Sequence, residues 1–126
     1  MKRMSIAEFH EAIRAQGVAH YDIALVCPMC DTVQSAHDLI SAGAGKDFDE
    51  VEKFLGFSCV GRFTGAGSPS KAAPGRGCIW TLGGLFQTHK LEVVDENGKA
   101  RPRFELASRE QAQAHADKRI ARGVAA

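Results

Sequence analysis

Four cysteines constrain this chain more than any other feature of its sequence. Cys27 and Cys30 form a Cys-Pro-Met-Cys turn, 28 residues separate that turn from Cys59, and 18 more separate Cys59 from Cys78. A tetrahedral thiolate site needs one such close pair, and its other two ligands can come from any positions that the fold brings near. A chain of 126 residues buries only a modest core, so a bound metal would supply useful folding free energy. The cysteines therefore predict a structural zinc site.

Other uses of the four cysteines stay open at this point. Cys27 and Cys30 could form a thioredoxin-like redox pair, which would require a βαβ frame. The thiols could also hold an iron–sulfur cluster or stay buried and free. A histidine could replace one cysteine, and the candidates are His37, seven residues after Cys30, and His89, eleven residues after Cys78. Four thiolates would leave zinc no open coordination position, so the predicted metal is structural and not catalytic.

Length and composition indicate a single domain spanning residues 1–126. Hydrophobic residues make up 44% of the chain and charged residues 25%, as in ordinary soluble proteins. No apolar run approaches the roughly 18 residues of a membrane span, and the basic start lacks the apolar segment of a secretory signal. We therefore expect a cytoplasmic protein with no membrane partner, in a compartment where paired cysteines bind metal more often than they form disulfides.

Capping residues and helically spaced apolar residues predict four helices. The clearest signal is the capping box of Ser5 and Glu8 at the first of them. The last is alanine-rich, so its apolar face is thin and we expect it to pack weakly or to contact a partner. The predicted helices, with their N-caps, are 6–16 (Ser5), a short one capped by Asp31 or Thr32, one capped by Asp47, and 108–122 (Ser108).

Apolar runs predict the strands. Residues 90–94 and 103–106 flank Asn97-Gly98, a strong two-residue turn signal, and should form a hairpin. Pro102 would place the second of these strands at a sheet edge. The elements together predict an α+β fold, with helices around a small antiparallel sheet, a C-terminal hairpin and a terminal helix. Shorter strands are expected at 21–26 and 78–82.

Residues 61–77 are rich in glycine and proline and show no apolar periodicity, which predicts a long loop. Loops of this length in compact domains are commonly functional. No carboxylate lies between Lys53 and Lys90, so this loop can form a positive surface for an acidic partner. The alternative is that it is neutralised on folding by residues 1–52, which carry nine acidic and four basic side chains. The residues predicted to contact a partner are Arg62, Phe63, Lys71 and Arg76.

We find no motif that carries catalysis. The chain has no His-Glu-x-x-His, no Gly-x-Ser-x-Gly and no P-loop sequence. Its acidic cluster at 47–50 lies where a helix N-terminus favours carboxylates in any case. The sequence therefore favours a binding protein over an enzyme.

Three cysteine-bearing blocks carry a resemblance to a known group of proteins. They are 27–30 (Cys-Pro-Met-Cys), 56–62 (Gly-Phe-Ser-Cys-Val-Gly-Arg) and 75–86 (Gly-Arg-Gly-Cys-Ile-Trp-Thr-Leu-Gly-Gly-Leu-Phe). Over roughly residues 23–94 the chain resembles small proteins encoded by phages and prophages. The resemblance implies a mobile-element origin, a shared four-cysteine core and the cytoplasm of a bacterial host. Since small phage accessory proteins often inhibit host defence, including CRISPR systems and restriction enzymes, the expected partner is a host defence protein.

Nucleic acid is the alternative partner. Phosphates could be contacted by Arg62, Lys71 and Arg76 and by the basic residues of the last predicted helix, and binding would then weaken steeply with salt. The net charge of only +1, and the expected place of Trp80 in the core, argue against this alternative. The basic residues of the last helix are Arg109, Lys118, Arg119 and Arg122.

Overall fold

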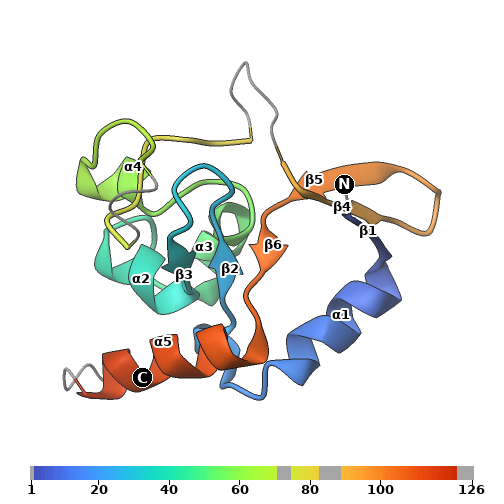
Figure 1. The fold of residues 1–126 in the computed structure, drawn as a ribbon, viewed down its shortest axis with the longest axis horizontal. Helices are drawn as coiled ribbons and strands as arrows, with labels where there is room; N and C mark the ends of the chain where they lie inside the picture. The colour runs from blue at the N-terminus through green and yellow to red at the C-terminus, as the bar shows by residue number, and fades with distance from the viewer. Residues whose placement is uncertain (1, 71–74, 83–88, 122–126) are drawn as a thin grey trace.

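The computed structural model describes residues 2–70, 75–82 and 89–121. These residues form an α+β fold in which helices surround two three-stranded sheets (Figure 1), so the predicted fold class is confirmed. Lys71 and Arg122, which were expected to contact a partner, lie outside the described residues. Within the described ranges, no helix has the length and apolar character needed to cross a membrane.

The first sheet contains the predicted hairpin and one strand that was not predicted. β4 (Leu91–Val94) and β5 (Ala100–Arg103) pair antiparallel, so the second strand of the hairpin is 100–103 and not 103–106 as predicted. Pro102 lies within this strand, which is at the sheet edge as expected. β1 (Lys2–Ser5) pairs parallel with β4 on its other side. The sheet is therefore mixed, whereas the sequence predicted antiparallel pairing alone.

The second sheet carries the cysteine turn. β2 (Leu25–Val26) pairs antiparallel with both β3 (Val33–Gln34) and β6 (Glu105–Leu106). The predicted strand over 21–26 is shorter than expected, because η1 (His20–Asp22) is a turn of 3-10 helix. Between β5 and β6 the chain crosses from one sheet to the other at Phe104, which is fully buried and stacks on Trp80.

The first and third predicted helices are confirmed with their caps. α1 (Ile6–Ala15) begins with the Ser5 capping box, and α3 (Phe48–Leu55) begins at Asp47, whose carboxylate accepts the Glu50 N–H. The C-cap of α1 is Gln16, and its side chain is buried. This amide donates to the carbonyls of Ala24 (2.8 Å) and Ala107 (2.9 Å) and accepts the Ala24 N–H (3.0 Å). Gln16 thus ties the end of α1 to the second sheet.

The second predicted helix starts later than expected. α2 (Ala36–Ser41) is capped by Ser35 and not by Asp31 or Thr32. Val33 and Gln34, which follow these two residues, pair with β2 as strand β3, so the chain is extended there. Asp31 adopts a left-handed conformation, with φ of 58°, that closes the cysteine turn.

Two other predicted segments differ from the structure. The expected loop over 61–77 begins with a short helix, α4 (Gly61–Thr64). Residues 78–82 were expected to form a strand, but they make only an isolated bridge between Ser58 and Thr81. Backbone hydrogen bonds hold this segment against 57–59 nevertheless, which keeps residue 78 beside residue 59.

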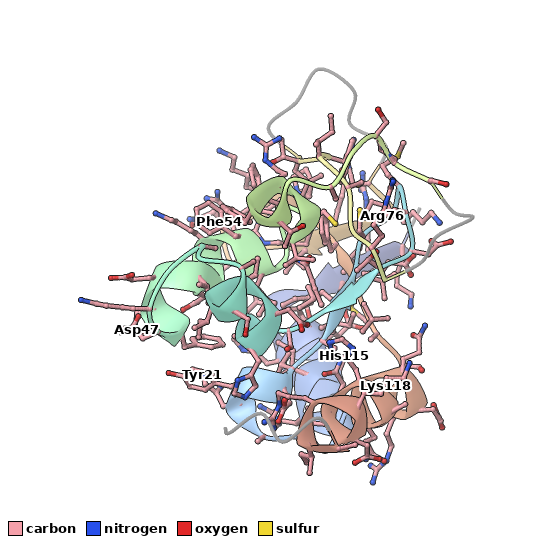
Figure 2. The ribbon with its side chains drawn as sticks, turned by 90° about the vertical axis from the view of Figure 1, so that its left-hand side faces the viewer. Tyr21, Asp47, Phe54, Arg76, His115 and Lys118 are labelled. Carbon is pink, nitrogen blue, oxygen red and sulfur yellow. The ribbon has the colours of Figure 1, made fainter. Side chains whose placement is uncertain are left out.

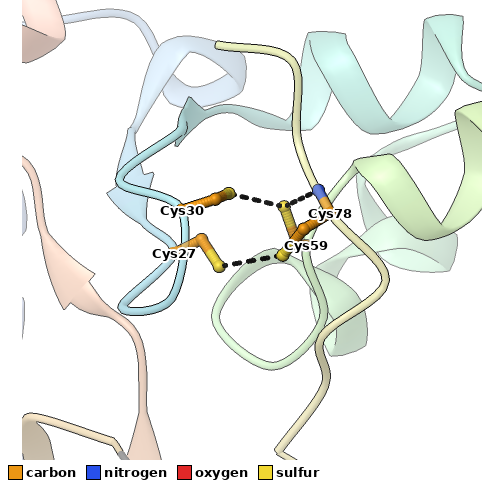
Figure 3. Close-up of side chains that lie close together, drawn as sticks. All are labelled: Cys27, Cys30, Cys59 and Cys78. Carbon is orange, nitrogen blue, oxygen red and sulfur yellow. Dashed lines mark hydrogen bonds between the residues drawn. The ribbon is translucent and has the colours of Figure 1, made fainter. Parts of the chain in front are cut away.

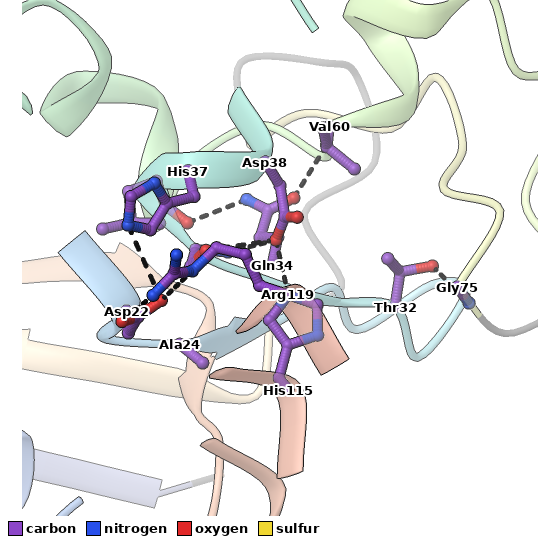
Figure 4. Close-up of polar contacts among 12 residues, drawn as sticks. Asp22, Ala24, Thr32, Gln34, His37, Asp38, Val60, Gly75, His115 and Arg119 are labelled. Carbon is purple, nitrogen blue, oxygen red and sulfur yellow. Dashed lines mark hydrogen bonds and ion pairs between the residues drawn. The ribbon is translucent and has the colours of Figure 1, made fainter. Parts of the chain in front are cut away.

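α5 (Arg109–Ala121) is the predicted last helix, and polar contacts hold it in place. Its buried apolar residues are only alanines, since Ile120 is 62% exposed. Arg119 donates two hydrogen bonds of 2.8 Å to Asp22, and His115 Nε2 lies 2.6 Å from Asp38 Oδ2 (Figure 4). These ion pairs dock α5 on η1 and α2.

Candidate metal centre

The four cysteine side chains converge in the core (Figure 3). All are fully buried, and their Sγ atoms lie within 4.8 Å of one another. The Sγ atoms of Cys27 and Cys78 are 3.8 Å apart, as are those of Cys30 and Cys59. Four sulfurs at about 2.3 Å from a tetrahedral metal would be about 3.8 Å from each other. The group predicted from the sequence therefore could hold a single metal ion.

Two separate parts of the chain supply the sulfurs. Cys27 and Cys30 lie on the turn between β2 and β3, which is closed by the hydrogen bond from the Asp31 N–H to the Cys27 carbonyl (2.9 Å). Cys59 follows α3, and its Sγ accepts the backbone N–H of Cys78 at 3.3 Å. The two ends of the 61–77 segment are thus brought together against the β2–β3 turn.

Backbone N–H groups are directed at three of the four sulfurs. Those of Met29 and Cys30 contact Cys27, that of Trp80 contacts Cys78, and those of Gly61 and Cys78 contact Cys59. An N–H group that donates to sulfur stabilises the thiolate and lowers the pKa of the cysteine. These N–H groups therefore favour the ionised form that a metal requires, against the opposing effect of burial on the pKa of Cys27 and Cys78.

The thiols of Cys27, Cys59 and Cys78 differ in pKa. The neighbouring Cys27 thiol lowers the pKa of Cys59 to about 5, and Cys59 in turn raises the pKa of Cys27. Burial raises the pKa of Cys78 to about 12. Without a cation, ionisation of several of these thiols is unfavourable, because negative charge in the core is costly. A divalent cation would offset that cost and allow the thiols to ionise.

Thr32 connects the cysteine turn to the far end of the 61–77 segment. Its Oγ1 lies 3.1 Å from Cys30 Sγ and accepts the N–H groups of Gly75 (3.1 Å) and Gly77 (3.0 Å). These two bonds occupy both lone pairs of the hydroxyl oxygen. When Cys30 is a thiolate, the hydroxyl proton of Thr32 is therefore left to donate to its sulfur.

Gln34 positions the residues around Cys59, and the sequence did not reveal this role. Its side chain is fully buried, donates to the carbonyls of Leu55 and Ser58 (2.9 Å each) and accepts the Val60 N–H at 2.7 Å. These three backbone groups belong to the residues just before and after Cys59, and Figure 4 shows the contact of Gln34 with Val60. The sequence offers one signal for this role, a glutamine in the short strand after the cysteine turn, and a single glutamine predicts little by itself.

The two histidines considered as substitute ligands lie outside the cysteine group. His37 Nε2 is 3.7 Å from Asp22 Oδ1, and His89 Nε2 is 3.1 Å from Glu92 Oε2. Burial lowers the pKa of His37, and the charge of Arg119 lowers it further. Among the described residues, the metal-ligand group therefore consists of the four cysteines alone.

A family model described as VVA0879-like matches residues 5–107. The matched range is most of the chain and includes all four cysteines. This chain belongs to the VVA0879-like family. The match ends before α5 begins, so it covers the metal centre but not the last helix. No curated protein and no solved structure matches the chain.

In this VVA0879-like chain, the residues that were predicted to contact a partner differ in their exposure and their contacts. Arg62 Nη1 donates to the Ile79 carbonyl at 2.7 Å, and Arg76 Nη2 donates to the Ser68 carbonyl at 2.6 Å. Both arginines are exposed. Phe63 is only half-buried, and its ring packs 5.0 Å from that of Phe54. The arginines thus hold the backbone at Ser68 and Ile79 while remaining open to solvent.

Gly61 must be glycine for the four-cysteine group of this VVA0879-like chain to close. A Cβ at this position would lie 2.6 Å from the Gly77 carbonyl carbon and 2.7 Å from the Cys78 oxygen. We expect Gly61→Ala to cost about 3 kcal/mol of unfolding free energy, because only backbone atoms could move aside. Gly67→Ala is the matched control, since its Cβ would meet only the Arg76 side chain at 4.0 Å. Urea unfolding of both variants checks the difference, and equal stabilities would contradict the close approach.

Proposed function

We propose that this protein is a zinc-stabilised binding protein that acts by contact with a partner and not by catalysis. The observation that carries the proposal is the position of the four buried cysteines, which tie both ends of the 61–77 segment to the core. A metal bound at these sulfurs would hold the base of the segment rigid. Preorganised segments bind with less loss of conformational entropy.

The donor set supports zinc in a structural role. Four thiolates in a tetrahedral arrangement are typical of structural zinc sites, and a four-thiolate site leaves no position for water or substrate. The convergence of all sulfurs within 4.8 Å favours one ion over a multi-iron cluster. Zinc would cross-link the core, and residues outside the cysteine group would contact the partner.

The surface we assign to the partner is the loop face, which we define as Arg62, Arg76 and Ile79. Ile79 is 51% exposed although it directly follows a cysteine of the metal group. Among the described residues, neither arginine forms an ion pair with a carboxylate. Two unpaired guanidinium groups beside an exposed apolar side chain suit an acidic protein surface.

The resemblance to phage-encoded proteins adds the proposal that the partner is a host protein, with defence nucleases such as CRISPR effectors and restriction enzymes as the first candidates. The cytoplasm of the bacterial host is then the compartment of the interaction. The carboxylate-free stretch between Lys53 and Lys90 also suits nucleic acid, so the experiment must separate these two partners.

Affinity isolation from a bacterial host lysate tests the proposal. We expect wild type to recover one host protein in stoichiometric amount, and Arg62→Glu/Arg76→Glu to recover at least tenfold less, since charge reversal opposes an acidic surface. Arg14→Glu/Lys46→Glu makes the same change of charge at exposed residues outside the loop face and should bind as wild type does. Loss of the partner after nuclease treatment would favour nucleic acid, and equal recovery by all three proteins would refute the loop face.

A further inference from the structure

A groove of about 660 Å³ lies between α5 and the elements that carry the metal centre. One wall consists of residues of α2, β3 and α5, and the other contains Val60, Thr64 and residues 75–76. This volume falls within the range of small-molecule sites, about 300–1,000 Å³. The loop face shares only Arg76 with this groove.

Cationic side chains enter the groove from both walls. Arg76 comes from the segment beside Cys78, and Lys118 comes from α5. In Figure 2 His115 lies near Lys118, and Arg76 lies farther up on the same side of the view. Among the described residues, neither Arg76 nor Lys118 forms an ion pair with a carboxylate.

The other charges of the groove largely neutralise each other. The Asp38 carboxylate accepts from His115 and from the backbone and hydroxyl of Ser35, and these bonds lower its pKa against the opposing effect of burial. Arg119 is paired with Asp22. Asp31 is the remaining carboxylate in the lining and is exposed. The lining of the groove therefore carries more positive charge, from Arg76 and Lys118, than its own carboxylates neutralise.

The parts of the groove that carry these cations are held in place. The Thr32 hydroxyl accepts the N–H groups on both sides of Arg76, at Gly75 and Gly77. On the opposite wall, the bidentate pair of Arg119 with Asp22 fixes the turn of α5 that carries Lys118. Cations fixed in this way lose less entropy when they bind an anion.

Small apolar side chains complete the lining. They offer a surface for the uncharged part of a ligand, while the cations would bind its anionic group. Guanidinium and ammonium groups together are the usual phosphate-binding pair in proteins. The apolar residues are Val33, Ala42, Val60 and Ala114.

We propose that this groove binds a phosphate-bearing ligand of about mononucleotide size, with Arg76 and Lys118 contacting the phosphate from opposite walls. The groove can be tested separately from the loop face. Lys118 is not part of the loop face, so a change at this residue affects the groove alone. Arg76 borders both surfaces.

Titration of the ¹⁵N-labelled, zinc-loaded full chain with AMP tests the groove by NMR. We expect amide shifts confined to residues 75–76 and to α5 around residues 114–118. Lys118→Ala and Arg76→Ala should each weaken AMP binding about tenfold, as the loss of a charge-assisted hydrogen bond does. Lys46→Ala removes an exposed charge outside the groove and should leave the affinity unchanged within twofold.

Three further probes identify the source of the phosphate. Inorganic pyrophosphate binding as tightly as AMP would assign the site to the phosphate group alone, and tighter AMP binding would assign it to a nucleotide. Displacement of AMP by a ten-residue thymidine oligonucleotide would assign it to a nucleic-acid backbone. Any one of three results would overturn the proposal. These are equal affinity for adenosine and AMP, no response to millimolar AMP and pyrophosphate, and an unchanged affinity of Lys118→Ala for AMP.

Discussion

Replacing Cys59 by serine will remove the bound metal and unfold most of the chain. Cys59 supplies one of the four sulfurs, and its Sγ accepts the Cys78 N–H and has a pKa lowered to about 5. Structural zinc contributes roughly 10–16 kcal/mol of apparent binding free energy, which is comparable to the whole stability of a small domain. We expect urea unfolding of Cys59→Ser at 25 °C to show no cooperative transition.

Metal analysis of purified wild type should find one zinc per chain, and excess chelator should bring wild type to the state of Cys59→Ser. Cobalt(II) bound in place of zinc should give the intense visible bands of a tetrahedral thiolate site. Cys27→Ser should unfold the chain as well, whereas a redox pair at Cys27 and Cys30 would tolerate that change. Wild type that is free of metal and indifferent to chelator would contradict the metal centre.

Gln34→Met will cost about 3 kcal/mol of unfolding free energy and will also loosen the metal. Methionine has nearly the shape of glutamine but leaves the Leu55 and Ser58 carbonyls and the Val60 N–H without their buried partner. Each unsatisfied buried group costs about 1–3 kcal/mol, and partial relaxation reduces the sum. Since these groups frame the turn that presents Cys59, we expect chelator to extract the metal at least tenfold faster.

Gln16→Met is the matched control for this prediction. Gln16 is equally buried and also makes three backbone hydrogen bonds, but it contacts Ala24 and Ala107, which carry no metal ligand. We expect a similar loss of stability, measured by urea unfolding, with an unchanged rate of metal extraction. Equal extraction rates in both variants would show that Gln34 supports the fold in general and not the metal centre.

Local signals in the sequence predicted the elements that depend on neighbouring residues. Ser5 and Asp47 cap their helices as expected, because the bonds that define a cap lie within the first turn. Asn97-Gly98 predicted its hairpin for the same reason. The cysteines were grouped correctly because thiols that bind one metal must converge whatever path the chain takes.

Features that depend on distant partners were not predictable in this way. β1 is polar and short, and only pairing with β4, about 90 positions away, makes it a strand. Thr32 does not cap a helix because its hydroxyl accepts the Gly75 and Gly77 N–H groups. Neither buried glutamine could be distinguished from a surface glutamine, since burial at both is imposed by the backbone groups around them.

The parallel pairing of β1 with β4 has a consequence for the order of assembly on the ribosome. All four sulfurs have been synthesised once residue 78 emerges, and the metal can begin to close the core from that point. β1 is made before any of the cysteines but must wait for residues 91–94 before it has a strand to join. β1 is therefore among the last strands to dock although it precedes every cysteine in the chain, and a metal-bound intermediate with β1 unpaired would precede the complete fold.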